Sequence, residues 1–128
     1  MEDVLNRMDP IKKLNLINAA FKEFGTNRFE KASTNTIVKE AGISKGLLYH
    51  YFKTKDDLYE YLIDFSMKAI AVPIAEKIGY KEQDIIKRIE LISKLKLEIM
   101  NQYPGLVIFS KVMFVGMDYE DIKKMIEK

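Results

Sequence analysis

The stretch "GISKGLLYHYFKTKDDL", residues 42–58, twice places a lysine directly after a helix-capping residue. Ser44 and Thr54 are both favourable N-caps, so Lys45 and Lys55 are each expected at the first position of a new helix. The amino end of a helix already carries a partial positive charge, and an added cation there is mildly unfavourable. Two lysines at such positions indicate that an interaction outside their own helices compensates this cost.

A short helix and a tight turn precede this stretch. Ser33 or Thr34 can cap the short helix, and Gly42 can end it. Its apolar positions are Ile37, Val38 and Ala41. The helix that starts near Ser44 has its own apolar positions at Leu48, Tyr51 and Phe52. Two short helices joined by a turn that contains glycine form a helix-turn-helix, whose second helix enters the major groove of DNA.

Helices are also expected on both sides of this pair. Asp9 and Pro10 favour a helix start, and Gly25 is expected to stop that first helix. Its apolar positions recur at helical spacing and are Ile11, Leu14, Ile17, Ala20, Phe21 and Phe24. Downstream, Thr54 and Asp57 have the spacing of a capping box for a fourth helix. The apolar positions of that fourth helix are Leu58, Leu62, Phe65 and Ala69.

The second half of the chain is also predicted to be helical. Pro73 is expected to kink or end the fourth helix. A fifth helix over about 82–102 has apolar residues around most of its circumference, which favours a central, buried position. We expect a break at Pro104 and Gly105, a helix over roughly 106–115, and a last helix that starts near Asp118. With no strand-like alternation, the sequence predicts an all-α fold.

The helix-turn-helix explains the two lysines. An ammonium group beside a phosphate releases counterions, and this effect dominates DNA affinity, so Lys45 and Lys55 are expected to contact phosphates. Gly46 would let the helix backbone approach the duplex, and Leu47 could pack on a thymine methyl group. Tyr49 and His50 offer hydrogen bonds from the next turn. The alternative is that the lysines are solvated and that the aromatic residues only pack against the protein.

Residues 32–62, "ASTNTIVKEAGISKGLLYHYFKTKDDLYEYL", resemble the TetR family of transcriptional regulators, including the run Tyr49, Phe52, Lys55. The resemblance covers about residues 10–70. It implies a three-helix DNA-binding head over 10–70, with the helix-turn-helix at about 33–52, and part of a helical regulatory domain over 71–128. It also implies phosphate contacts by Thr34, Ser44, Lys45, Tyr49 and Lys55, and a groove-facing turn with Gly46, Leu47, His50 and Tyr51. The family often has alanine at the position of Val38, a difference that we interpret as a core adjustment. It often has a small or polar residue at the position of Leu47, and this difference leaves the DNA sequence preference open.

The same resemblance implies a mechanism. Such proteins usually act as homodimeric repressors on a near-palindromic operator in double-stranded DNA, and a small-molecule effector releases them by moving the fourth helix. The candidate pocket residues in this chain are Phe65, Met100, Tyr103, Phe109 and Met113. Each of them also fits a plain core position. Because family members are generally longer and dimerise through later helices, we expect this chain to be a fragment.

Composition narrows the other possibilities. The 128 residues include no cysteine and one histidine, and the sequence shows no metal-spaced ligand set and no Gly-rich phosphate loop, so we expect no enzyme activity, metal or cofactor. Nothing predicts a signal peptide or a membrane span, which favours a cytoplasmic protein. Residues 1–55 hold ten Lys and Arg against six Asp and Glu, a net of +4, consistent with a polyanion partner. Two alternatives remain: a helical small-molecule-binding or protein-interaction domain without specific DNA binding, and non-specific architectural DNA binding.

Overall fold

The computed structural model describes residues 3–77 and 83–114 of the chain, and all regular structure within these ranges is helical. The helices are α1 (Pro10–Thr26), α2 (Thr34–Ala41), α3 (Lys45–Tyr51), α4 (Lys55–Lys77), α5 (Ile85–Gln102) and α6 (Pro104–Phe114). The all-α prediction is therefore confirmed. The helix expected near Asp118 lies outside the described residues.

Local capping determines where α1 and α4 begin. The Asp9 carboxylate accepts hydrogen bonds from the backbone amides of Ile11 and Lys12, at 2.9 and 3.2 Å. At α4, the Thr54 amide donates to the Asp57 carboxylate at 3.3 Å, and the Asp57 amide donates to the Thr54 hydroxyl at 3.1 Å. This reciprocal pair is the capping box that the sequence predicts.

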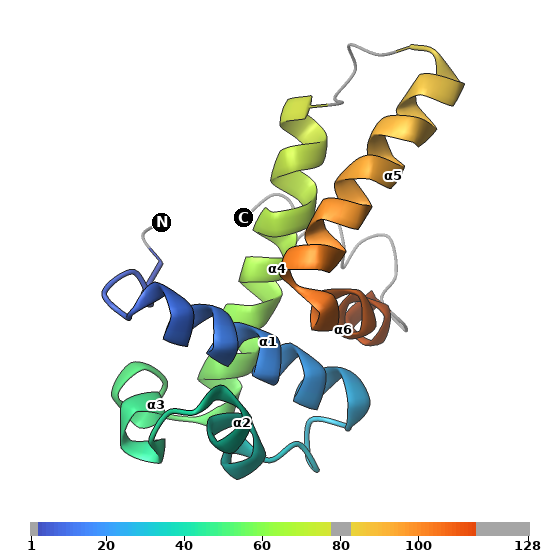
Figure 1. Cartoon of the computed structure of the whole chain (residues 1–128). Helices are drawn as coiled ribbons and strands as arrows, with labels where there is room; N and C mark the ends of the chain where they lie inside the picture. The colour runs from blue at the N-terminus through green and yellow to red at the C-terminus, as the bar shows by residue number, and fades with distance from the viewer. Residues whose placement is uncertain (1–2, 78–82, 115–128) are drawn as a thin grey trace.

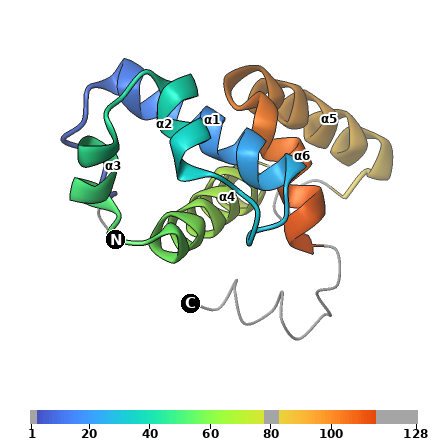
Figure 2. The same ribbon diagram turned by 90° about the horizontal axis from the view of Figure 1, so that it is seen from below.

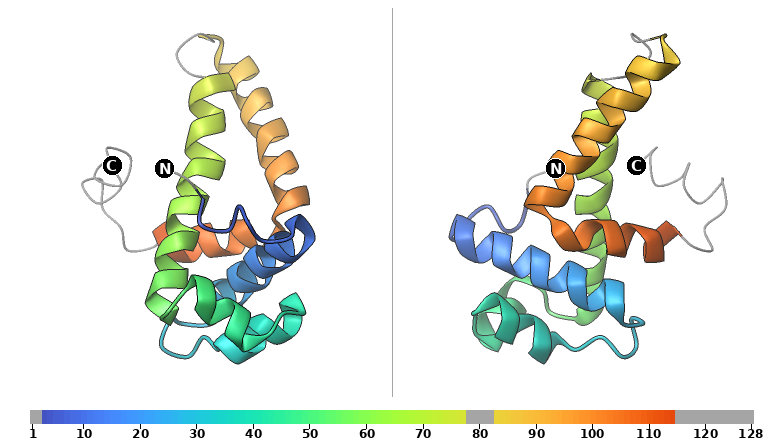
Figure 3. Two further views of the ribbon diagram at one scale, coloured as in Figure 1. Left: turned by 90° about the vertical axis from the view of Figure 1, so that its left-hand side faces the viewer. Right: turned by 45° about the vertical axis from the view of Figure 1, so that its right-hand side comes forward.

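The helices form a small stack built around α1 and α4. Figure 1 shows α1 crossing the long helix α4, with α2 and α3 at one end of the molecule and α5 beside the second half of α4. In Figure 3, α1 lies between α6 on one side and α2 on the other, and it contacts both of these helices. The first helix is therefore the shared support of the helix-turn-helix and of the later helices.

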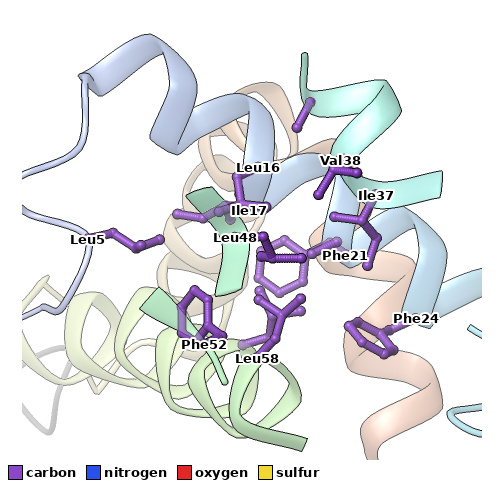
Figure 4. Close-up of a cluster of buried hydrophobic side chains, with 14 of the residues drawn as sticks. Leu5, Leu16, Ile17, Phe21, Phe24, Ile37, Val38, Leu48, Phe52 and Leu58 are labelled. Atoms are coloured by element: carbon purple, nitrogen blue, oxygen red, sulfur yellow. The ribbon is translucent and has the colours of Figure 1, made fainter. Parts of the chain in front are cut away.

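The core is centred where α1, α2, α3 and the first half of α4 meet. Figure 4 shows the side chains of Phe21, Ile37, Leu48 and Leu58 converging from these four helices, and all four are almost completely buried. Full burial of each such side chain contributes about 1.5–3 kcal/mol. The predicted apolar positions of α2 and α3 and most of those of α1 thus form the core.

The apolar face predicted for α1 is wrong at its amino end. Ile11 is 71% exposed and Leu14 is 37% exposed, whereas Leu16 and Ala19 are buried instead. The reason is that α1 packs between two other helices and buries a broad face farther along its length, while its first turns extend beyond them. Helical periodicity alone does not show where along a helix its neighbours begin.

Two glycines bring α1 and α6 unusually close together. A β-carbon added to Gly25 would lie 2.9 Å from Cγ2 of Ile108 and 3.1 Å from the amide nitrogen of Phe109. A β-carbon added to Gly105 would lie 2.9 Å from the β-carbon of Phe21 and 3.0 Å from the amide nitrogen of Lys22. Gly25 therefore does not stop α1, which continues to Thr26, but permits the contact with α6.

Two expectations for the later helices are also corrected. Helix α4 continues through Pro73 and ends at Lys77, so the proline does not end it. Helix α5 is not central, because Leu95 is its one buried residue within the described part of the chain. Large apolar side chains on its other faces are exposed: Ile85, Ile86, Ile89, Leu91, Ile92, Leu97 and Met100. Packing against α4 and α6 covers one face of α5 only.

The carboxylate of Asp3 connects the segment before α1 to α1 and α4. The Asp3 side chain accepts hydrogen bonds from the hydroxyl of Tyr61 in α4 at 2.8 Å and from the ammonium of Lys13 in α1 at 3.0 Å. Burial by itself would raise the pKa of Asp3, but the hydrogen bonds from the Leu5 amide, Lys13 and Tyr61 outweigh it and hold that pKa below its ordinary value. Asp3 therefore ties α1 to α4 as a charged group.

Candidate DNA interface

The turn between α2 and α3 is fixed by its backbone. Gly42 has φ of 71°, in the left-handed region that glycine adopts without strain. Its amide donates to the carbonyl of Lys39 at 3.3 Å, and the amide of Ile43 donates to the carbonyl of Val38 at 3.1 Å. These two bonds form a Schellman motif, and Ile43 packs against the core. The turn therefore holds α3 at a defined angle to α2.

The predicted phosphate-contacting residues of α2 and α3 gather on one surface. The hydroxyl groups of Thr34, at the start of α2, and Tyr49, in α3, are 3.4 Å apart. The ammonium of Lys45 lies 5.8 Å from the centre of the Tyr49 ring, close enough for a cation–π contact. The Ser44 hydroxyl accepts a hydrogen bond from the Leu47 amide at 3.0 Å, which leaves its proton available to an outside acceptor.

The groove-facing residues expected in α3 divide into two kinds. Gly46 and His50 are exposed, and a β-carbon on Gly46 would meet nothing nearer than the Ser44 hydroxyl at 4.0 Å. Leu47 and Tyr51 are half-buried and pack against the core, so only part of each side chain is available to a ligand. Figure 2, which views the chain from below, shows α3 at the periphery of the molecule.

Comparison with known proteins identifies the type of head. Residues 16–62 match the family described as bacterial regulatory proteins, tetR family. The fold also superposes on the crystal structure of a TetR family transcriptional regulator from Chloroflexus aurantiacus, with a TM-score of 0.66 and 23% identity, over 98% of this chain and 58% of the other. Residues 16–62, which contain the helix-turn-helix, are therefore similar to the tetR family. The matched family is one of regulatory proteins, which agrees with the expectation of no enzyme activity.

Two relatives are more similar to this chain in sequence, each over 76 residues. The nucleoid occlusion factor SlmA of Aliivibrio fischeri is 36% identical over 76 residues, which are 59% of this chain and 38% of that protein. The protein of the same name from a Marinomonas species is 33% identical over 76 residues, with the same coverage. The chain thus spans less than half the length of these relatives.

Among the predicted site residues, Lys55 has the placement that differs most from the expectation. It begins α4, but its ammonium turns back to the connection between α1 and α2. There it donates hydrogen bonds to the carbonyl groups of Phe29 at 2.6 Å, Ala32 at 3.3 Å and Glu30 at 3.4 Å. It also lies 4.5 Å from the centre of the Phe29 ring. In sequence these partners are 23 to 26 residues away, so no local pattern indicates them.

A cavity of about 250 Å³ lies between α4, α5 and α6. Most of its lining is apolar, and its residues are Ile70, Ile92, Leu95, Lys96, Ile99, Leu106, Val107, Ser110 and Lys111. Several of these lining residues are apolar in the sequence, but the sequence does not show whether an apolar residue lines a cavity or packs in the core.

The predicted pocket residues are placed differently. Phe65 and Tyr103 line a neighbouring, wider hollow between α4 and α5, with their ring centres 5.1 Å apart. Phe109 is fully buried against Phe21, with ring centres 5.1 Å apart, which makes it a core residue. Met100 is 39% exposed, and the side chain of Met113 lies outside the described residues.

The described ranges contain no group of three or more His, Cys, Asp or Glu residues placed to hold a metal ion. Within the same ranges, no helix has the length and apolar character that a membrane span requires.

Proposed function

We propose that this protein is a sequence-specific, DNA-binding transcriptional regulator that places α3 in the major groove. The observation that carries the proposal is the surface cluster of half-buried Thr34 with exposed Lys45 and Tyr49, which combines two hydroxyl groups and one cation from two helices of a helix-turn-helix. Hydroxyl and ammonium groups are the usual partners of phosphate oxygens, and such contacts orient the recognition helix. Ser44 supplies a further hydroxyl at the start of α3.

Gly46 supports the same proposal. Glycine inside a helix costs roughly 1 kcal/mol relative to alanine. Nothing in the described part of the chain requires its small size, because the nearest atom to an added β-carbon would be the Ser44 hydroxyl at 4.0 Å. A close approach of another molecule to the α3 backbone would explain why glycine occupies this position. Beside it, His50 and the exposed parts of Leu47 and Tyr51 are the candidate base-reading groups.

We further propose that the protein acts in the cytoplasm as a homodimeric repressor. Two heads related by two-fold symmetry would occupy two half-sites of a near-palindromic operator, and the spacing of the heads would control affinity. The relatives named nucleoid occlusion factors match 59% of this chain and 38% of their own length, so their role is not extended to this protein.

Selection of bound duplexes from a random pool tests the proposal. A near-palindromic consensus would support sequence-specific binding by a dimer, and a single half-site would support binding by a monomer. Equal affinity for selected and random duplexes would instead support architectural DNA binding. No affinity for either duplex at low salt would leave the helical protein-interaction domain as the better assignment.

We also propose that a small molecule in the cavity between α4, α5 and α6 regulates DNA binding. The cavity of about 250 Å³ is close to the lower end of the usual range for ligand pockets, roughly 300–1,000 Å³. Its apolar walls suit a hydrocarbon body, and Lys96, Lys111 and Ser110 suit an anionic group. A bound molecule changes DNA affinity only if it prefers one arrangement of the helices over the other.

Thermal unfolding in the presence of matched compounds tests this regulation. A ligand that binds only the folded protein raises its melting temperature. Short alkyl carboxylates are expected to raise it, and alkyl amines of the same length are not. Lys96→Met together with Lys111→Met should abolish the difference between the two series. Equal stabilisation of the unsubstituted protein by amines and carboxylates would contradict the proposed anionic ligand.

A further inference from the structure

We propose that Lys55 is a positioning residue of the DNA interface and does not contact a DNA phosphate. In this role its hydrogen bonds hold residues 27–33, the connection between α1 and α2, against the start of α4. We call these hydrogen bonds the lock. The connection leads directly into Ser33 and Thr34, so the lock determines where the first turn of α2 lies. The inference rests on the proposed DNA binding, since it concerns how the binding surface is held.

The hydrogen bonds of the ammonium group carry this inference. A lysine ammonium has three N–H donors, and Lys55 directs hydrogen bonds to three carbonyl groups, those of Phe29, Glu30 and Ala32. The side chain is also half-buried. To reach a phosphate, the ammonium would have to leave all three carbonyls, and each carbonyl at a partly buried position would then need another donor.

The aromatic packing around the same connection supports the lock. The Phe29 ring lies under the Lys55 ammonium, 4.5 Å from it, and Tyr59, one helical turn farther along α4, meets that ring edge-on at 5.2 Å. Phe24 of α1 stacks on Phe29 at 6.0 Å and meets Tyr59 at 5.1 Å. Helix α4 thus contacts the connection at two successive turns, through the ammonium of Lys55 and through the ring of Tyr59.

The lock also accounts for a cation at the amino end of α4. The partial positive charge of that helix end opposes Lys55, but the dipoles of the three carbonyl groups favour it. Lys45 at the start of α3 differs, because it is exposed and its described contact is the ring of Tyr49. The two lysines look equivalent in the sequence, yet the geometry gives only Lys45 the position of a phosphate contact.

Paired variants separate the two roles. Each phosphate contact contributes about 0.9 to the slope of log affinity against log salt concentration. We expect Lys45→Met to make this slope shallower by that amount. Lys55→Met should lower affinity by about tenfold at every salt concentration and leave the slope unchanged. A slope that becomes shallower in Lys55→Met as well would overturn the proposal, as would unchanged affinity.

Amide hydrogen exchange of the protein without DNA provides the second readout. The amides of Lys31 and Ala32 donate to the Arg28 carbonyl, both at 2.9 Å, and report on the connection. Their exchange should become about tenfold faster or more in Lys55→Met and remain unchanged in Lys45→Met. Unchanged exchange in Lys55→Met would overturn the lock.

The unsubstituted protein offers a test that does not depend on the folding of a variant. An ammonium group held by three carbonyls exchanges its protons slowly, so its nitrogen signal should be detectable by NMR and should persist when DNA is added. Loss of slow exchange, or coupling to phosphorus in the complex, would overturn the proposal. If the protein does not bind DNA, the proposed function fails, but the exchange and NMR results on the free protein still decide whether the lock exists.

Discussion

Gly25 of α1 and Ile108 of α6 approach so closely that a β-carbon added to the glycine would lie 2.9 Å from Cγ2 of the isoleucine. We expect Gly25→Ala to lower the free energy of unfolding by about 1–3 kcal/mol, because overpacking outweighs the gain in helix propensity. Gly105→Ala should cost at least as much, since its β-carbon would meet the backbone nitrogen of Lys22 at 3.0 Å. Urea denaturation measures both values. Unchanged stability in both variants would mean that the two helices can separate freely.

Gly46→Ala is the same substitution as Gly25→Ala, made on the proposed binding surface instead of between two helices. Its β-carbon would lie in open space, and alanine is the better helix former, so stability should stay equal or rise by up to about 1 kcal/mol. DNA affinity should fall by about tenfold, because the added methyl group holds the helix backbone away from the duplex. Denaturation and a binding titration on the same preparation check both parts. Unchanged affinity would remove Gly46 from the interface.

Tyr49→Phe removes only the hydroxyl group that lies 3.4 Å from that of Thr34. Because the residue is exposed, the fold should keep its stability within about 0.5 kcal/mol. Loss of one hydrogen bond to a phosphate should weaken DNA binding by about two- to tenfold for all sequences alike. Titration with the selected duplex and a scrambled duplex distinguishes a uniform loss from an altered preference. An altered preference would make Tyr49 a base-reading residue.

Asp3→Asn should reveal a pH-dependent contribution to stability. The folded-state pKa of Asp3 lies below its ordinary value of 3.8, so its ionised form stabilises the fold above that pH, and the stabilisation is lost as pH falls through the folded-state pKa. We expect the variant to be less stable by about 1–2 kcal/mol at neutral pH. The difference should shrink steadily in acid.

Urea denaturation of both proteins at several pH values measures this dependence. Tyr61→Phe removes one of the three hydrogen-bond donors to the carboxylate. Over the same pH range, this variant should lose a smaller part of its free energy of unfolding than the unsubstituted protein. The difference in the free energy of unfolding between Asp3→Asn and the unsubstituted protein could instead stay constant down to acid pH. That result would show that the charge of the carboxylate does not contribute to stability.

Features set by neighbours in the sequence were predictable. Asp9, Ser44 and Thr54 cap the helices that the sequence assigns to them, since each side chain bonds an amide two or three residues away. Gly42 ends α2 as predicted, and the structure shows that it does so in the left-handed conformation. The burial of Ile37 and Leu48 followed from helical spacing alone.

Features set by distant parts of the chain were not predictable. The exposure of Ile89 in α5 depends on which helices lie beside it, and an apolar pattern around a helix does not reveal that. Lys55 illustrates the same limit at the candidate site, because its carbonyl partners come from a turn that the sequence does not place near α4. Lys45 and Tyr49 lie one helical turn apart within α3, so helical spacing alone accounts for the contact between them.

Helix α6 has a different neighbour on each of its two sides. Gly105 and Phe109 meet α1, which supports the head, while Val107 and Lys111 line the cavity. At the glycines the backbones meet with almost no intervening side chain that could change rotamer and absorb a shift. We therefore expect a ligand that displaces α6 to displace α1 with it, and with α1 the support of α3.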